Sequence, residues 1–228
     1  MTTPLLAASS FGSIVHFFLQ GGIFMIPLML CSLTGAAIIL LRWFALKRKN
    51  ILPAHVESEI EDLQAGDDGE ALTRLSRIVR GDTSPLARVA QVVLQHLQWP
   101  KSETIEAVQT RARHEIMRME AGMAVLEVIV GIAPLLGLLG AVSGLVTVFA
   151  EFGQNSNIND PRGIARGISE ALSTTVVGMA IAIPVLIAHS YFTKKIENMA
   201  AEMESLISDL INKCYYRKSL SRQAADTE

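Results

Sequence analysis

Glu170 is a lone carboxylate at the start of a long apolar segment in the C-terminal third of the chain. Asp160 followed by Pro161 is a typical start for a helix, which puts Glu170 nearly three turns into that helix. A carboxylate at the centre of a membrane-spanning helix costs about 2.5–3.5 kcal/mol, so such a residue faces a bundle interior or a water-filled cavity. We expect Glu170 to face such an interior or cavity.

Polar and small side chains continue along the same helical face. Ser173, Thr174 and Gly178 follow Glu170 by three, four and eight residues, so they extend a narrow polar stripe into the apolar segment. A second interpretation stays open. Glu170 could lie at the outer membrane interface and pair with Arg166, four residues earlier.

The remaining polar residues give no sign of covalent chemistry. No histidines or carboxylates have the spacing of a metal site. No nucleotide-binding loop, nucleophile–base pair or cofactor fingerprint is present. The net charge of -2 argues against a nucleic-acid binder. We therefore expect a protein that is not an enzyme and that holds no metal and no cofactor.

Three apolar runs must position these residues. Gly21–Leu41, Val128–Ala150 and Ala171–Thr193 each hold about 20 or more residues without a charge, the length a helix needs to cross a hydrocarbon core of about 30 Å. The composition agrees, because 50% of the residues are hydrophobic and 18% are charged. Three such runs in a short chain disfavour a soluble helical bundle. We predict an integral membrane protein with three transmembrane helices.

The positive charges predict the orientation. Of the 20 Lys and Arg residues, only Arg162 and Arg166 fall between the second and third spans. The positive-inside rule therefore places the N-terminus and this loop outside, and the long segment after the first span and the C-terminal tail in the cytoplasm. The expected segments are an outer segment, 1–20, with a weak amphipathic pattern; a first span, 21–41; a cytoplasmic helical region, 42–127; a second span, 128–150; an outer loop and helix start, 151–166; a third span, 167–193; and a cytoplasmic helix and tail, 194–228.

The cytoplasmic parts have the pattern of helices, so the predicted fold is all-α. Three short helices are expected over Pro53–Gln64, Gly69–Arg80 and Pro85–Gln98. Apolar residues then recur every three or four positions from Ile105 to Leu126, and again from Ile196 to Cys214. We predict that the second and third spans each extend into the cytoplasm as one long helix. The two stripes could pack within the chain or between copies in a ring.

Small residues in the second span predict close helix packing. Gly137 and Ala141 are four residues apart, as are Gly140 and Gly144, so each pair shares a helix face. Pro134 is expected to kink this helix because it lacks an N–H and its ring crowds the preceding turn.

Two runs of residues resemble the signature of the ExbB/TolQ/MotA proton-channel family. They are Ala133–Gly140 in the second span and Gly167–Gly178 in the third, the latter followed by Ala182-Ile183-Pro184. The three-span layout is similar to the ExbB and TolQ branches, whereas the MotA branch has four spans. Within these third-span runs, Gly178 and Pro184 are expected to take part in helix packing.

The resemblance implies a motor in the bacterial inner membrane. Family members form a homopentameric ring whose second and third spans line a pore. The pore holds single-span ExbD/TolR-like partners, each with a membrane aspartate. Proton flow then drives a periplasmic TonB- or TolA-like effector. Glu170 matches the family's glutamate and Thr175 its pore threonine.

One position departs from the family pattern. Ala141 stands where the second-span motif commonly has threonine, so a hydroxyl of the proton path is missing. Ser143 and Thr147 are nearby candidates to replace it, as is Thr174 across the pore. The first two do not share a helical face with position 141, which argues against simple replacement.

Two other functions remain open on the sequence. The chain could be a structural membrane scaffold that conducts nothing, or a self-contained ion channel. The effector system, and the choice of protons over sodium, are also left open by the residues.

Overall fold

The computed structural model describes the backbone of residues 23–63, 69–154 and 161–225, and side chains within 23–63, 70–150, 165, 167–169 and 171–216. The described residues form two units. An apolar unit contains residues 23–40, 122–154 and 161–190, and a polar unit contains residues 41–63, 69–121 and 191–225. The expected N-terminal amphipathic segment, 1–20, lies outside the described residues.

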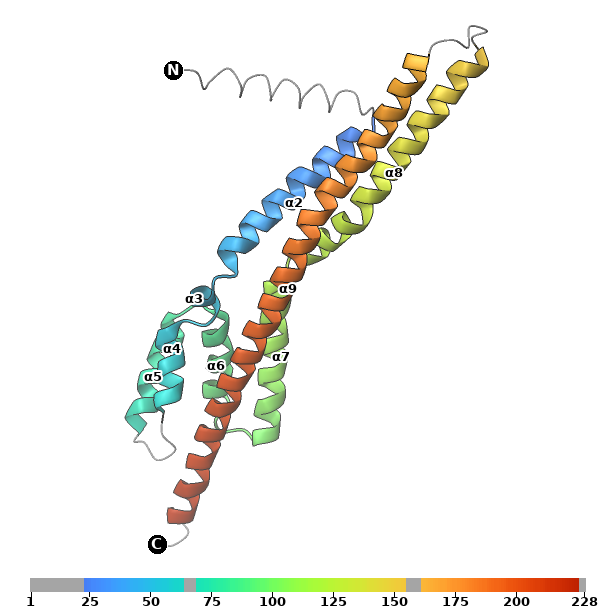
Figure 1. Ribbon diagram of the computed structural model, residues 1–228. Helices are drawn as coiled ribbons and strands as arrows, with labels where there is room; N and C mark the ends of the chain where they lie inside the picture. Colours follow the sequence, from blue (N-terminus) through green and yellow to red (C-terminus); the bar gives the residue numbers. More distant parts are fainter. Residues whose placement is uncertain (1–22, 64–68, 155–160, 226–228) are drawn as a thin grey trace, which may run out of the picture. The chain divides into compact units, whose positions relative to one another are not determined.

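Three helices are long and apolar enough to cross a membrane, as predicted. They are α2 (Met25–Ala45), α8 (Met123–Gln154) and α9 (Pro161–Ala225), shown in Figure 1. Every regular element of the described residues is a helix, which confirms the all-α prediction. The prediction of a long helix that extends beyond the third span is also correct, because α9 is continuous over 65 residues.

The prediction of one helix running from the cytoplasmic region into the second span is wrong. Helix α7 (Lys101–Met119) ends before a turn, and α8 starts separately at Met123. Gly122 in this turn has φ of 80°, a left-handed conformation that glycine adopts without strain and that commonly ends a helix. The apolar stripe crosses the break undisturbed, since Met119, Met123 and Leu126 are all buried. The regular spacing of apolar residues therefore gave no sign of the turn.

The polar unit contains four short helices: α3 (Arg48–Ile51), α4 (Ala54–Asp62), α5 (Gly69–Gly81) and α6 (Pro85–Gln95). Helix α6 packs against both α5 and α7 and forms the centre of this group. Its start follows from the sequence Ser84-Pro85. The Ser84 hydroxyl accepts a hydrogen bond from the Ala87 N–H at 3.2 Å, and proline is tolerated at the first helical position.

The apolar stripe of α9 is covered within the polar unit. Ile196, Met199, Met203, Leu210 and Cys214 are all buried in the single chain. Packing inside the chain therefore accounts for the burial of these five residues.

Polar contacts fix the C-terminal part of α9 to the helices of the polar unit. The Lys213 Nζ donates to the carbonyl oxygens of Ile60 at 3.0 Å and Glu61 at 2.9 Å, which belong to the last turn of α4. Carbonyls at a helix end lack partners within the helix, so a lysine stabilises them. The Tyr215 hydroxyl lies 2.6 Å from that of Thr104 and donates to the carbonyl of Trp99 at 3.0 Å.

A buried carboxylate links α6 to α7. The Glu115 side chain on α7 is fully buried, and its Oε2 lies 2.7 Å from Nη2 of Arg88 on α6. Its Oε1 lies 3.0 Å from Arg111 and 3.9 Å from Arg118 on its own helix. The cluster was not predicted from the sequence. The signal was the spacing of the two arginines on α7, four residues before and three after Glu115.

Removing this carboxylate should destabilise the polar unit. Glu115→Ala leaves Arg88 and Arg111 without their common partner, and breaking a buried ion pair costs about 3–5 kcal/mol. We expect a clear fall in the thermal melting temperature of the detergent-solubilised protein. Glu120→Ala, at an exposed position after α7, is the matched control and should change stability by less than about 0.5 kcal/mol. Equal melting of the two variants would contradict this role of Glu115.

Asp82 should make the polar unit sensitive to acid. Partial burial favours a higher pKa for Asp82, but hydrogen bonds from Ser84 and the nearby His55 outweigh it, so the pKa lies below the ordinary 3.8. Because the pKa of Asp82 is lower in the folded state, its ionised carboxylate stabilises the fold above pH 3.8. This stabilisation is lost as the pH falls through the folded-state pKa. We expect Asp82→Asn to reduce stability at neutral pH and to flatten the decline below about pH 4. Melting curves across this range, with exposed Asp62→Asn as control, measure the effect.

Candidate functional site

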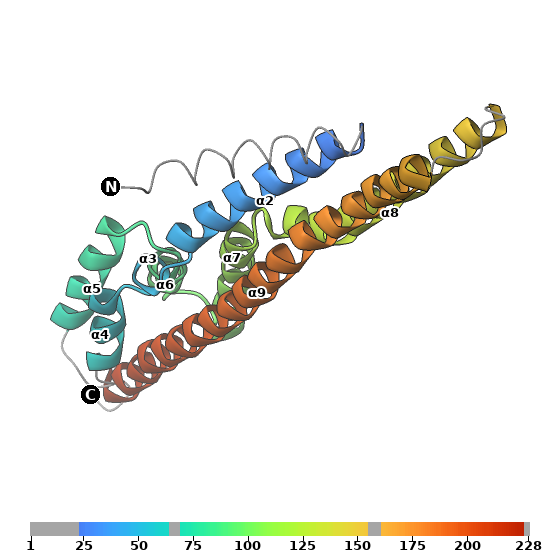
Figure 2. The same cartoon turned by 45° about the horizontal axis from the view of Figure 1, so that its top comes forward.

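The backbones of α8 and α9 are in direct contact in the apolar unit. Figures 1 and 2 show the two helices side by side. A Cβ placed on Gly178 would lie 2.5 Å from the carbonyl oxygen of Ala133, and one placed on Gly137 would lie 2.9 Å from the carbonyl oxygen of Thr174. Real Cβ atoms do not approach backbone atoms this closely, so these positions require glycine at the observed helix separation.

Two further glycines continue this contact along α8. A Cβ on Gly140 would lie 2.6 Å from Cγ2 of Thr174, and one on Gly144 would lie 3.0 Å from Cβ of Ala171. Ala141 is buried as well. Small residues allow helices to approach where lipid removes the usual hydrophobic driving force, and they gain dispersion energy by doing so.

A threonine of α9 forms a hydrogen bond across this contact. The Thr175 hydroxyl donates to the carbonyl oxygen of Gly137 on α8 at 3.2 Å. A backbone carbonyl has two lone pairs, so Gly137 can accept this bond in addition to its own helical one. Thr174 is 2% exposed, with its methyl group against Gly140. The two neighbouring threonines are therefore both placed by the glycines opposite them.

Ser143 and Thr147 lie elsewhere on α8. Both side chains are exposed in the single chain, and the Thr147 hydroxyl donates to the Ser143 carbonyl of its own helix at 3.1 Å. On α9, the Ser173 hydroxyl similarly donates to the Ser169 carbonyl at 2.7 Å. The structure thus brings Thr174 and Thr175 to the α8–α9 contact but does not bring Ser143 and Thr147 to it.

Glu170 belongs to the helical backbone of α9, one turn before Thr174 and next to Ala171, which contacts Gly144. The side chains of Glu170 and Arg166 lie outside the described residues. The choice between a pore carboxylate and an ion pair with Arg166 therefore remains a prediction from the sequence.

The first span packs onto the α8–α9 pair. A Cβ on Gly35 of α2 would lie 3.1 Å from Cγ2 of Val185 on α9 and 3.7 Å from Cδ1 of Ile129 on α8. Pro134 and Pro184 lie inside α8 and α9, which continue through them. The described residues contain no group of three or more His, Cys, Asp or Glu side chains placed to hold a metal ion.

Comparison with known families gives this arrangement a context. The model of the MotA/TolQ/ExbB proton channel family matches residues 82–205, which is more than half of the chain and includes all of α8 and the membrane part of α9. The chain belongs to the MotA/TolQ/ExbB proton channel family. This confirms the resemblance seen in the two runs of the second and third spans.

Individual relatives of this family carry ExbB names. A homologue of the biopolymer transport protein ExbB from Methanothermobacter thermautotrophicus is 28% identical over 89% of this chain and 70% of its own length. An ExbB-like biopolymer transport protein of Synechocystis is 33% identical, over 75% of this chain and 66% of its own. ExbB of Neisseria gonorrhoeae is 26% identical over 83% and 89%. The chain is thus a membrane protein with a general ExbB-like role in transport.

The contact of Gly178 with the backbone of α8 is open to a direct test. Gly178→Ala would place a methyl group 2.5 Å from a backbone oxygen, which the helices can relieve only by moving apart. We expect a loss of about 1–3 kcal/mol in stability, typical of overpacking, measured as a lower melting temperature in detergent.

Gly131→Ala is the matched control for this substitution. Nothing lies within 4 Å of a Cβ placed on Gly131, so alanine should be neutral or should stabilise α8 by up to about 1 kcal/mol through its higher helix propensity. An equal loss of stability in both variants would show that Gly178 does not determine the separation of α8 and α9.

Proposed function

We propose that this chain is the ring subunit of a motor complex driven by the proton-motive force in the bacterial inner membrane. In this proposal, copies of the chain form a ring, expected to be a pentamer. The ring surrounds ExbD/TolR-like single-span partners whose membrane aspartate exchanges protons. The motion is passed to a periplasmic effector of the TonB or TolA type. The chain itself acts as a channel component and not as an enzyme.

The observation that carries the proposal is the α8–α9 pair itself. The family match includes the part of the chain that holds Gly137, Gly178 and the hydrogen bond of Thr175. A helix pair fixed by backbone contact is a rigid wall, which suits a pore that must keep its lining in place while a partner moves inside it.

Residues of both helices can supply a proton path in this ring. Glu170 precedes the Thr174–Thr175 pair by one turn on α9, and exposed Ser143 and Thr147 offer hydroxyls on α8. Titratable residues in membrane spans are typical of proton relays. Ala141 has no hydroxyl, and its side chain is buried within the single chain. The proposed proton path therefore does not use this position.

The orientation in the proposal follows from charge. Arg42, Lys47, Arg48 and Lys49 follow the first span closely, and Lys194 and Lys195 belong to the polar unit. The positive-inside rule then places the polar unit in the cytoplasm and the N-terminus in the periplasm. A periplasmic effector would be reached through the partner proteins.

Neutralising Glu170 tests the proposed proton path. Glu170→Gln keeps the size and hydrogen-bonding capacity of the side chain but removes its proton exchange. We expect proton flux through the complex, reconstituted in liposomes with its single-span partner, to fall to background. Assembly, measured by native mass spectrometry, should remain intact. Glu120→Gln, in the polar unit, is the control and should conduct normally.

Other outcomes would favour the other functions. Full proton-driven activity of Glu170→Gln would exclude Glu170 as a carrier. Normal effector function after collapse of the proton gradient would indicate a scaffold. Ion flux through the purified chain without any partner would indicate a self-contained channel.

A further inference from the structure

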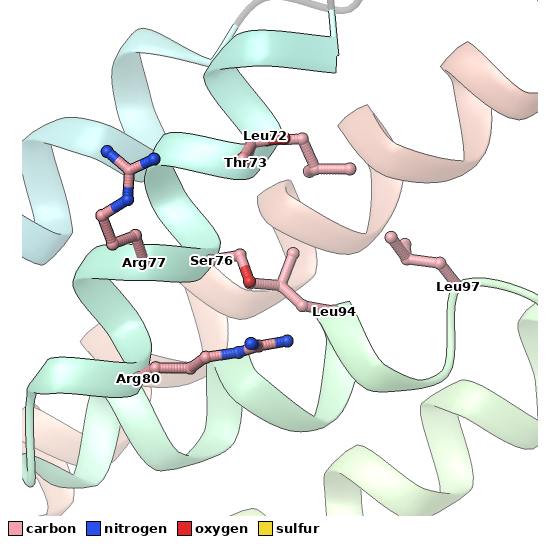
Figure 3. Close-up of a pocket in the computed structure, with 7 residues that line it drawn as sticks. All are labelled: Leu72, Thr73, Ser76, Arg77, Arg80, Leu94 and Leu97. Carbon is pink, nitrogen blue, oxygen red and sulfur yellow. The ribbon is translucent and has the colours of Figure 1, made fainter.

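A basic groove lies between α5 and α6 in the polar unit. We define it by Leu72, Ser76, Arg77, Arg80, Leu94 and Leu97, which line a cavity of about 470 Å³. Figure 3 shows Arg80 extending from α5 toward α6 beside Leu94, and Leu72 and Leu97 pointing toward one another. Neither Arg77 nor Arg80 forms an ion pair with an acidic side chain of the described residues. The groove thus combines apolar side chains with the charge of Arg80, and Arg77 lies at its edge with a guanidinium that points away from Leu94.

An acidic groove lies between α6 and α7. We define it by Val92, Trp99, Glu103, Glu106, Ala107 and His114, which line a cavity of about 680 Å³. Glu103 and Glu106 form no ion pair within the described part of the chain. Arg111 also lines this groove, and its guanidinium points to the buried Glu115, 3.0 Å away, which it shares with Arg88.

The two grooves open on opposite sides of α6. Val92 lines the acidic groove and Leu94 the basic one, and two residues along a helix are about 200° apart around its axis. A chain with two different, complementary surfaces that face different directions can bind a second copy head to tail. Such contacts close into a ring when the rotation between copies allows it.

We propose that the basic groove of one copy docks against the acidic groove of the next copy, forming a cytoplasmic contact of the ring. The proposal rests on the ring of the proposed function and names the surfaces that join its subunits outside the membrane. In this contact, arginines of α5 face Glu103 and Glu106 of α7. Each pair is flanked by apolar side chains that association would bury.

Trp99 is the expected anchor of this contact. It is 45% exposed, although its ring packs edge-on against His96 at 3.9 Å between centroids. Exposed tryptophan beside a groove is typical of the central residues of protein interfaces. Charge complementarity favours a second copy of this chain over an anionic lipid headgroup, because a lipid would account for the arginines and leave the acidic groove unexplained.

Charge reversal with rescue tests the contact in the full-length protein extracted from its membranes. The first variant combines Arg77→Glu with Arg80→Glu, and the second combines Glu103→Arg with Glu106→Arg. Each places like charges at the proposed contact, so we expect subunit affinity, followed by native mass spectrometry on dilution, to fall by about tenfold. A chain that carries all four substitutions should regain the ring, because the charges are complementary again.

The matched control reverses two positive charges outside both grooves, Lys49→Glu with Arg113→Glu, and should leave the ring unchanged. Unchanged rings in the first two variants would overturn the proposal. A fourfold variant whose subunit affinity is lower still than that of either double variant would also overturn it. A loss in the arginine variant that the glutamate reversal does not rescue would indicate a lipid site and would also overturn it.

Disulfide trapping distinguishes this inference from the proposed function. Arg80→Cys with Glu106→Cys, in a chain whose Cys31 and Cys214 are replaced by alanine, should form a ladder of linked copies on mild oxidation. Each cysteine alone should give at most linked pairs. An intact ring without the ladder would overturn the docking surfaces and leave the ring standing. A wild-type chain that is a monomer in native membranes would overturn the ring as well.

Discussion

The contact between the backbones of α8 and α9 is the constraint on which the apolar unit depends. In lipid, apolar side chains gain little by leaving their surroundings, so helices associate through close packing and a few polar contacts. Gly137 and Gly178 allow that approach, and the Thr175 hydroxyl adds a hydrogen bond across it. The position of each threonine is thus decided by the absence of a side chain on the opposite helix.

The sequence was sufficient to predict the three spans and the small residues between them. Span prediction works because the hydrocarbon core penalises charge over about 20 residues, a condition that soluble helices rarely meet. The glycines of α8 could be assigned to one face from their spacing. Their partners on α9 could not, because spacing within one helix says nothing about the rotation of its neighbour. The acceptor of the Thr175 hydroxyl was unpredictable for that reason.

Two misses have different physical causes. The turn at Gly122 was overlooked because Met119 and Met123 keep the apolar stripe in register across the break, so periodicity alone could not show it. Glu115 was overlooked because a carboxylate between arginines on one helix normally forms ion pairs at the protein surface. Only its burial against Arg88, which lies on another helix, makes it structural. Tertiary context decided both cases.

The lysine at the end of α4 has a consequence for biosynthesis. Lys213 completes the hydrogen bonding of carbonyls at Ile60 and Glu61, more than 150 residues earlier in the chain. Translation releases α4 long before it releases Lys213, and the whole third span is made in between. The polar unit therefore reaches its final state only after membrane insertion is complete, and until then the nascent chain presents an unfinished helix end to the cell's chaperones and proteases.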